Sequence, residues 1–367
     1  MILRVEMLLL SLRKFIFYLL FVHCSSFLHD WSVLKKTFRL FQQAKLQTSL
    51  ERAQPNYDIV FKCRSTNNQQ VDDETNFDLQ LGDLKGFHRL RSHRSVALFL
   101  HGWRDEGSKQ WVQEMLTTWI HFQPNHYICI VDWGHLSQND YKAASGSIFE
   151  VGLTVAAIVE SMEAINPRFS RKNVTIAGFS LGAHAAGFAG SLLNGELEQI
   201  IALDPAAPMF TMPTIVAPKY RLDENDAQFV QVLHTSSGTL GTSVKCGHAD
   251  FYPNGGTVPQ PNCQQSSQIP ETRNRNPISC SHSTAAVFFK QSMDPTYPFL
   301  GTHCDSYTDF VNGLCAHGHL GRFGVHSKQL NHGNFYFITE PEEPYVKPVS
   351  IARRRFVTLL RFNKLIS

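Results

Sequence analysis

A serine flanked by two glycines is the pattern in this sequence that most directly suggests covalent chemistry. Gly178, Ser180 and Gly182 follow a short apolar run and precede a helix-compatible run at 183–193. A sharp strand-to-helix turn of this kind exposes a serine hydroxyl, and the glycines remove side chains that would clash with the strained backbone. The pattern predicts Ser180 as a nucleophile for acyl transfer.

An activated serine also needs a carboxylate and a histidine base, which follow the nucleophile in this chain order. Asp204 comes 24 residues after Ser180, at the end of the apolar run 200–203, so one helix and one strand would bring it to the same sheet edge. An aspartate that merely opens a turn before a proline is the alternative. Eight histidines follow Asp204, and spacing alone does not choose among them. His282 is favoured because it lies between a loop and the helix-like run 285–291.

The oxyanion formed during acyl transfer requires two backbone N–H donors. Leu181, directly after the nucleophile, supplies one, and Trp103 is the candidate for the second because it follows the apolar run 96–100 in a His-Gly-Trp sequence. His101 and His184 are interpreted as hydrogen-bonding residues of the fold rather than as catalysts.

The elements that must position these residues alternate along the chain. Apolar runs indicate strands at 58–63, 95–100, 127–132, 173–177 and 199–203, and helix-compatible segments lie at 108–122, 140–165 and 181–194. Strands buried on both faces are continuous in apolar residues, and crossover helices then cover both faces of a mainly parallel sheet. The sequence predicts one α/β domain over residues 56–346.

Composition excludes several classes of protein. The 367 residues are 43% hydrophobic and 18% charged, which is typical of a globular chain rather than a disordered or collagen-like one. The formal net charge is +3, but basic residues gather near the ends, and residues 27–346 carry −5. This body lacks the charge pattern that binds a phosphate backbone, so a nucleic-acid partner is not expected.

The two ends of the chain have patterns of their own. Residues 1–26 contain a basic pair, eight consecutive apolar residues and two serines, the layout of a secretory signal peptide, and eight apolar residues are too few to span a bilayer. Residues 27–55 form an N-terminal extension, either an extra helix or a propeptide. Residues 347–367 form a basic tail that either lies on an anionic membrane surface or is simply solvated.

Cysteine usage agrees with export. Eight cysteines suit an oxidising compartment, and loss of Cys24 with the signal peptide leaves seven, so at least one thiol stays free or pairs outside the chain. Cys129 is the expected buried free thiol because it lies inside the apolar run 127–131. Asn173 begins the one glycosylation sequon, Asn173-Val174-Thr175.

Several motifs in this sequence are similar to those of the pancreatic lipase family, which also contains secreted phospholipases A1 and many insect lipases. The resemblance covers roughly residues 56–340. The motifs that carry it are His101-Gly102-Trp103, Val131-Asp132-Trp133-Gly134, Gly178-Phe179-Ser180-Leu181-Gly182-Ala183-His184, Leu203-Asp204-Pro205-Ala206, Asp250-Phe251-Tyr252-Pro253-Asn254-Gly255-Gly256 and Cys280-Ser281-His282.

The resemblance implies an α/β-hydrolase fold and a role for each candidate residue. Ser180, Asp204 and His282 fall on the catalytic triad of the family, and Trp103 and Leu181 fall on its oxyanion donors. The resemblance therefore supports Asp204 and His282 as catalytic residues more strongly than their spacing alone does. No cofactor is required for the chemistry itself.

A calcium loop of the family is matched by residues 221–226. Arg221 would offer its backbone carbonyl, and Asp223 and Asp226 their carboxylates, to a structural calcium ion. Pro218 stands where the lipases usually carry glutamate, but that position serves through its carbonyl. Without the resemblance, residues 221–226 are interpreted as a solvated acidic loop.

The resemblance further implies two disulfides, Cys263–Cys280 and Cys304–Cys315. A zinc site formed by Cys315, His317 and His319 is the rival interpretation of the second pair, but it lacks the spacing of known zinc motifs. The first pair closes a lid of 16 residues, 264–279, that is short and polar. The loop between His234 and Gly247 is also brief.

Both loops are longer in triacylglycerol lipases of the family and shortened in its phospholipase A1 branch. The function predicted from the resemblance is therefore a secreted carboxylic-ester hydrolase that cleaves fatty acyl esters at a membrane or emulsion surface, leaning towards phospholipase A1. The alternatives are a triacylglycerol or galactolipid lipase and a non-catalytic, yolk-like lipid-binding protein. A colipase partner is not expected, because the sequence ends before the β-sandwich domain that pancreatic lipases carry.

Overall fold

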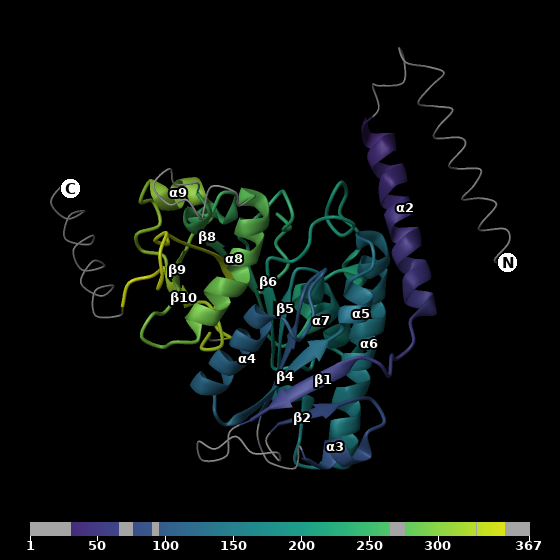
Figure 1. Cartoon of the computed structure of the whole chain (residues 1–367). Helices are drawn as coiled ribbons and strands as arrows, with labels where there is room; N and C mark the ends of the chain where they lie inside the picture. Colours follow the sequence, from purple (N-terminus) through teal and green to yellow (C-terminus); the bar gives the residue numbers. More distant parts are fainter. Residues whose placement is uncertain (1–30, 66–75, 90–94, 265–275, 328, 349–367) are drawn as a thin grey trace.

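The computed structural model describes residues 31–65, 76–89, 95–264, 276–327 and 329–348 (Figure 1). Within these residues the strands are β1 (Val60–Arg64), β2 (Asn76–Leu79), β3 (Ser95–Leu100), β4 (His126–Asp132), β5 (Val174–Phe179), β6 (Gln199–Leu203), β7 (Val230–Leu233), β8 (Ala249–Pro253), β9 (Leu300–His303), β10 (Leu320–Arg322) and β11 (Gly333–Phe337). The α-helices are α2 (Trp31–Arg52), α3 (Leu84–Arg89), α4 (Gln110–Phe122), α5 (Gly134–Ser137), α6 (Tyr141–Ile165), α7 (Leu181–Leu192), α8 (Pro277–Ser292) and α9 (Tyr307–Val311). Short 3-10 turns are η1 (Arg171–Asn173), η2 (Pro218–Tyr220), η3 (Glu224–Asp226), η4 (Asn254–Gly256) and η5 (Pro261–Cys263).

All of these strands belong to one sheet, in the order β10-β9-β11-β8-β7-β6-β5-β3-β4-β1-β2. The run from β11 to β4 is parallel. Antiparallel strands extend it at both ends, β1 and β2 beyond β4 and β9 and β10 beyond β11. Because all strands of a parallel run end at the same edge, the residues that follow β3, β5, β6 and β7 are brought together there.

Two hydrophobic cores lie on the two faces of the sheet. In β3, Val96, Leu98 and Leu100 contribute to one core, and Ala97 and Phe99 contribute to the other, as the alternation of side chains along a strand requires. The first core contains buried residues of α6 and α7, and the second contains those of α4 and α8. In Figure 1, α4 and α8 lie on one side of the sheet and α6 and α2 on the other.

These features confirm the predicted α/β-hydrolase fold, with a mainly parallel central sheet and helices on both faces. The predicted strands and helices are present, with bounds that agree to within two residues. The main difference is at α8, which begins at Pro277 rather than near residue 285, so His282 lies within a helix. Asn276 caps that helix by accepting a hydrogen bond from the Ile278 backbone N–H at 2.9 Å, and a proline at the first position favours the start.

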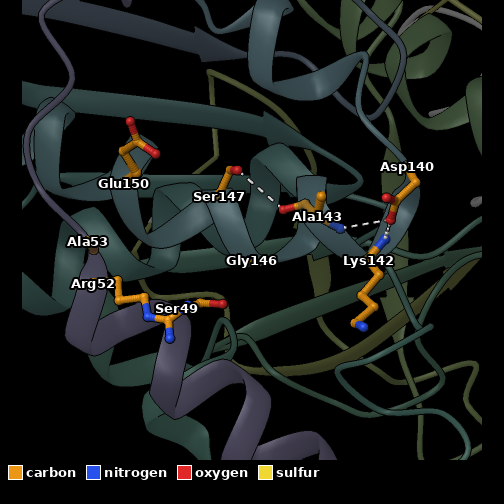
Figure 2. A pocket seen from close by; sticks show the side chains of 9 residues that line it. All are labelled: Ser49, Arg52, Ala53, Asp140, Lys142, Ala143, Gly146, Ser147 and Glu150. Carbon is orange, nitrogen blue, oxygen red and sulfur yellow. Dashed lines mark hydrogen bonds between the residues drawn. The ribbon is translucent and has the colours of Figure 1, made fainter. Parts of the chain in front are cut away.

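The N-terminal extension contains α2, which packs against α6. The two helices come so close that a Cβ at Gly146 would lie 2.7 Å from Ser49 Oγ. A groove of about 410 Å³ lies between them (Figure 2). None of the predicted catalytic residues lines this groove.

The cysteine prediction is wrong at one position. Cys129 is not free but pairs with Cys63, because β1 and β4 are neighbours in a register that sets the two residues opposite each other. Cys263–Cys280 and Cys304–Cys315 are disulfides as predicted. Cys246 is the buried free cysteine among the described residues.

Some sequence predictions fall outside the described residues. The signal peptide (1–26), most of the lid (265–275) and nearly all of the basic tail (349–367) are among them. Within the described part of the chain, no helix is both long enough and apolar enough to cross a membrane.

Candidate active site

Ser180 occupies the turn between β5 and α7 in a strained conformation. Its φ of 57° and ψ of −116° lie outside the regions that a non-glycine residue ordinarily adopts. A Cβ at Gly178 would lie 2.4 Å from the Gly182 carbonyl oxygen, and one at Gly182 would lie 2.3 Å from the Leu100 carbonyl oxygen. The turn therefore requires both glycines, and it holds the Ser180 backbone in the geometry of a nucleophile elbow.

Asp204 and His282 meet directly, although 78 residues separate them in the sequence. His282 Nδ1 lies 2.6 Å from Asp204 Oδ2. Asp204 is fully buried at the end of β6, and the His282 side chain is 12% exposed. A carboxylate oxygen accepts, so Nδ1 carries the proton and donates it, which leaves the Nε2 lone pair of a neutral ring available as a base.

Ser180 and His282 lie at the same sheet edge, and Phe179, the residue before Ser180, contacts the ring of His282. The rings of Phe179 and His282 have centroids 4.8 Å apart. Among the described residues, no hydrogen bond joins the Ser180 hydroxyl to His282; such contacts are often long without substrate and tighten when it binds. The structure thus joins Asp204 and His282 by a hydrogen bond and brings Ser180 to the same edge of the sheet.

Two backbone N–H groups and a hydroxyl hold the Asp204 carboxylate, and sequence reasoning missed all three. Thr235 N and Ser236 N donate to Oδ1 at 2.8 and 3.1 Å, and Ser236 Oγ donates to Oδ2. Ser236 Oγ also lies 3.4 Å from His282 Nδ1. Gly241 leaves room for the carboxylate, because a Cβ there would lie 2.3 Å from Asp204 Oδ1. The available signal was the position of Thr235 and Ser236 directly after an apolar strand that neighbours β6.

The predicted oxyanion donors lie beside the serine. Leu181 is the first residue of α7 and is fully buried. Trp103 follows β3, and the glycine before it packs against the elbow, since a Cβ at Gly102 would lie 3.1 Å from Ser180 Cβ. The Trp103 indole is anchored by a 2.8 Å hydrogen bond from Nε1 to the Asn139 carbonyl and by an edge contact with Tyr141.

His101 supports the loop that carries Trp103. Its ring stacks on Trp133 with centroids 5.3 Å apart, and its Nε2 accepts from the Trp133 backbone N–H at 3.3 Å. Next to it, burial opposes ionisation of Asp132, but the hydrogen bond and the charge of Lys62 help to hold the pKa of Asp132 below its ordinary value. The contacts of His101 are those of a structural residue.

His184 links α7 to the segment that follows Asp204. The Nε2–H donates to the Ala206 carbonyl at 2.8 Å, and Nδ1 accepts from the Leu222 backbone N–H at 3.1 Å. The ring stacks on Phe210 with centroids 3.9 Å apart. Complete burial lowers the pKa of His184 to about 4, so it stays neutral. Both ring nitrogens have structural partners, as the sequence interpretation expects.

A second histidine–aspartate pair lies next to Thr235 and Ser236, the residues that bind the Asp204 carboxylate. His234 Nε2 and Asp250 Oδ1 are 2.8 Å apart, and both side chains are fully buried. His234 Nδ1 also lies 3.0 Å from the Thr242 carbonyl, and the ring stacks on Tyr252. The pair joins the residue that follows β7 to the second residue of β8, and it fixes the residue just before the two N–H donors of Asp204. Sequence reasoning did not assign it.

An apolar cavity of about 200 Å³ opens beside the histidine, between α4 and α8. Trp111, Met115, Phe179, Ala286 and Val287 supply its apolar lining. The ring of Phe179 faces both this cavity and His282. An apolar compartment therefore adjoins His282.

The predicted calcium residues form a compact acidic turn. Within the described residues no three acidic, histidine or cysteine side chains cluster as a metal site. Asp223 and Asp226 are joined by a hydrogen bond from Asp223 N to Asp226 Oδ2 of 2.9 Å. Burial, together with the charge of Asp223, raises the pKa of Asp226 to about 8. Of the two carboxyl groups, that of Asp226 is the buried one.

The structure also describes the predicted glycosylation site, Asn173, and the cysteine of the predicted zinc alternative, Cys315. Asn173 is exposed at the end of η1, where a glycan would meet solvent. Cys315 is bonded to Cys304, so it has no thiolate to offer, and the rival zinc interpretation with His317 and His319 is wrong.

Several known proteins are similar to this chain. Pancreatic triacylglycerol lipase of Sus scrofa is 36% identical over 240 residues, which cover 62% of this chain and 52% of that protein. Lipase member H of Rattus norvegicus is 34% identical over 230 residues, covering 62% and 48%. The chain thus spans about half the length of these relatives. Among solved structures, the Pyrococcus furiosus esterase is 15% identical with a TM-score of 0.32, covering 53% of this chain and 76% of that one.

A family model described as "Lipase" matches residues 33–345. This match takes in every strand and every helix described above except the first two residues of α2. It includes the serine elbow, the Asp204–His282 pair and all three disulfides. The protein belongs to the lipase family.

Proposed function

We propose that the protein is a secreted carboxylic-ester hydrolase that cleaves fatty acyl esters of lipids, with Ser180, His282 and Asp204 as its catalytic triad. The observation that carries this proposal is the 2.6 Å hydrogen bond between His282 Nδ1 and Asp204 Oδ2 at the sheet edge where the strained Ser180 lies. The apolar cavity beside Phe179 is consistent with an acyl substrate.

The residues have distinct roles in this mechanism. His282 Nε2 takes the Ser180 hydroxyl proton as Oγ forms a bond to the ester carbonyl carbon, and Asp204 stabilises the resulting imidazolium. The same imidazolium then gives its proton to the departing alkoxide as the ester C–O bond breaks. Water, activated by His282 in the second half, releases the fatty acid from Ser180.

The negative oxygen of each tetrahedral intermediate faces the turn after Ser180. We assign the backbone N–H groups of Leu181 and Trp103 as its donors. A donor of this kind contributes about 10²- to 10³-fold to kcat, because it is aimed at the charge before the charge develops. Gly102 supports this role, since its lack of a side chain lets the Trp103 loop lie against the elbow.

Covalent labelling tests the nucleophile. A fluorophosphonate should label the wild-type protein at Ser180 and leave the Ser180→Ala variant unlabelled, and only the wild type should hydrolyse p-nitrophenyl butyrate. Equal labelling of both proteins would contradict the proposed function. Stoichiometric lipid binding without fatty-acid release would instead indicate the non-catalytic, yolk-like alternative.

Within this function we propose phospholipids as the preferred substrates, with cleavage of the phospholipase A1 type. The lid disulfide spans only 17 positions, and the segment between His234 and Gly247 is short, which leaves room for a polar head group. Parallel assays on phosphatidylcholine vesicles and on an emulsified triglyceride test the proposal. Activity on triglyceride or galactolipid alone would favour a neutral-lipid or galactolipid lipase.

We also propose a structural calcium ion held by Asp223, Asp226 and the Arg221 carbonyl, outside the chemistry itself. Its support is the buried, poorly ionised Asp226. Calcium should raise the Tm of the wild-type protein over its value in EDTA and leave the Tm of Asp226→Asn unchanged. The same shift in both proteins would contradict the assignment.

We propose that the protein acts outside the cell at a membrane or emulsion surface, with a glycan on Asn173. The three disulfides and the exposure of Asn173 support this location. Expression in a eukaryotic host should yield the protein in the medium, with a mass that falls after glycosidase treatment. Retention in the cytosol with free thiols would contradict it.

A further inference from the structure

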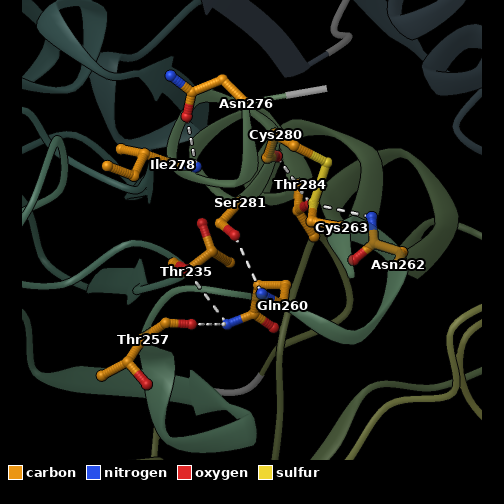
Figure 3. The surroundings of a disulfide bond; sticks show 10 residues. All are labelled: Thr235, Thr257, Gln260, Asn262, Cys263, Asn276, Ile278, Cys280, Ser281 and Thr284. Atoms are coloured by element: carbon orange, nitrogen blue, oxygen red, sulfur yellow. Dashed lines mark hydrogen bonds between the residues drawn. A yellow bond between two sulfur atoms is a disulfide. The ribbon is translucent and has the colours of Figure 1, made fainter. Parts of the chain in front are cut away.

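Gln260 is a fully buried amide that joins three segments of the active-site edge. Its Nε2 lies 3.2, 3.1 and 3.0 Å from the carbonyl oxygens of Thr235, Pro253 and Thr257, so its two N–H groups are shared among three acceptors. Its Oε1 accepts from Asn254 Nδ2 at 2.9 Å. Figure 3 shows the Gln260 amide between Thr235 and Thr257, with Ser281 close to its backbone. The side chain therefore makes every type of hydrogen bond that an amide can make.

The backbone of the same residue contacts the helix of the catalytic base. Gln260 N donates to Ser281 Oγ at 3.0 Å, and Ser281 directly precedes His282. The next residues continue along α8, because Asn262 Nδ2 donates to Thr284 Oγ1 at 3.0 Å and Cys263 is bonded to Cys280 (Figure 3). Segment 260–263 is thus clamped to the first turns of α8.

The segment that receives the side chain of Gln260 is the one that holds the catalytic acid. Thr235, whose carbonyl accepts from Gln260, gives its own N–H to Asp204 Oδ1, and the Ser236 N–H follows on the same oxygen. Gln260 therefore bonds through its side chain to Thr235, which holds Asp204, and through its backbone to Ser281, which precedes His282.

We propose that Gln260 is a positioning residue that sets the separation and orientation of Asp204 and His282. The inference rests on the proposed function, for which the two residues act as acid and base. Gln260 does not touch the reacting atoms; it acts through Thr235 on one side and Ser281 on the other. A hydrogen bond as short as that between His282 and Asp204 tolerates little movement, and misplacement of a catalytic group by about 1 Å costs about 10²-fold in rate.

The test compares Gln260→Met with Gln231→Met. Both glutamines are fully buried, and Gln231 bonds to Gln199 Oε1 and to the Gly324 backbone, away from the triad. Both variants lose a buried amide of the same size and should lose similar stability. Only Gln260→Met should lose kcat on p-nitrophenyl butyrate, by at least about 30-fold with KM changed less than about 3-fold.

A second variant removes the backbone contact alone. Ser281→Ala leaves the Gln260 side chain in place and should lower kcat by about 5- to 10-fold without a matching loss of Tm. If Gln260→Met does not fold, this variant decides, and full kcat in Ser281→Ala overturns the proposal. The rate of Ser180 labelling by a fluorophosphonate should fall in parallel with kcat.

The outcomes separate this inference from the proposed function. Hydrolysis by wild type and none by Ser180→Ala supports the function. On that background, equal kcat in Gln260→Met and Gln231→Met, scaled to the folded fraction, overturns the positioning role alone. Equal hydrolysis by wild type and Ser180→Ala overturns the function, and the positioning role with it.

Discussion

Gly241 offers a sharp test of how the carboxylate of Asp204 is held. A methyl group added at Gly241 would place its Cβ 2.3 Å from Asp204 Oδ1 and 2.5 Å from both Cγ and Oδ2. Ordinary contact begins at 3.4 Å, so the carboxylate or the loop must move by about 1 Å. Gly241 is not among the glycines with positive φ, so the backbone itself accepts alanine.

The expected effect of Gly241→Ala is on catalysis. Movement of the carboxylate by about 1 Å spoils its 2.6 Å hydrogen bond to His282 and should lower kcat by about 10²-fold, equivalent to about 2.7 kcal/mol of transition-state stabilisation. The assays are kcat for p-nitrophenyl butyrate and the rate of Ser180 labelling by a fluorophosphonate, with Tm measured on the same samples.

Gly238→Ala in the same loop is the matched control. Gly238 has a φ of 76°, and a Cβ there would meet nothing within 4 Å. Alanine at this position should cost about 1–2 kcal/mol of stability through left-handed strain but leave kcat within about 2-fold of wild type. Wild-type turnover in Gly241→Ala, or an equal loss of kcat in Gly238→Ala, would refute the reasoning.

Three further predictions concern stability and reactivity. The pKa of His184 is about 4 in the folded state and near 6.5 in the unfolded state, so unfolding takes up a proton in mild acid. As the pH falls from 6.5 towards 4, the protein should therefore lose up to about 3 kcal/mol of stability. A plot of Tm against pH should be flatter for the His184→Gln variant than for wild type. Replacing Cys263 and Cys280 with serine should lower the free energy of unfolding by about 3 kcal/mol, measured by urea denaturation, and an unchanged value would contradict the loop-closure argument. Burial raises the pKa of Cys246, so iodoacetamide at pH 8 should label it only after unfolding, and rapid native labelling would show that it is accessible.

Local patterns account for much of the fold that was predicted from sequence. The strands β3 to β6 are buried on both faces, so they are continuous in apolar residues and could be recognised without their partners. The short strands β9 and β10 contain glycine and polar residues, and β9 pairs with β10 and β11, which both lie later in the chain. Strands of that kind form because a neighbour supplies their hydrogen bonds, which a linear pattern does not record.

The turn that holds Ser180 was predictable because its requirements are local. Ser180 needs a strand before it, a helix after it and a glycine two residues away on each side, and all of these lie in one short segment. Asp204 and His282 were assigned by motif resemblance, because eight histidines follow the acid and spacing does not separate them. Their hydrogen bond is a tertiary contact.

The sequence by itself predicted the serine elbow and the strands of the parallel sheet, because both depend on residues that are neighbours in the chain. Only the tertiary structure decided that Cys129 pairs with Cys63, since strand register sets them opposite each other. Only it placed Thr235 and Gln260 around the acid–base pair. Most of these contacts are made by backbone N–H and carbonyl groups, which nearly every residue carries. Which of them contact Asp204 and His282 therefore depends on how the chain folds and not on side-chain identity.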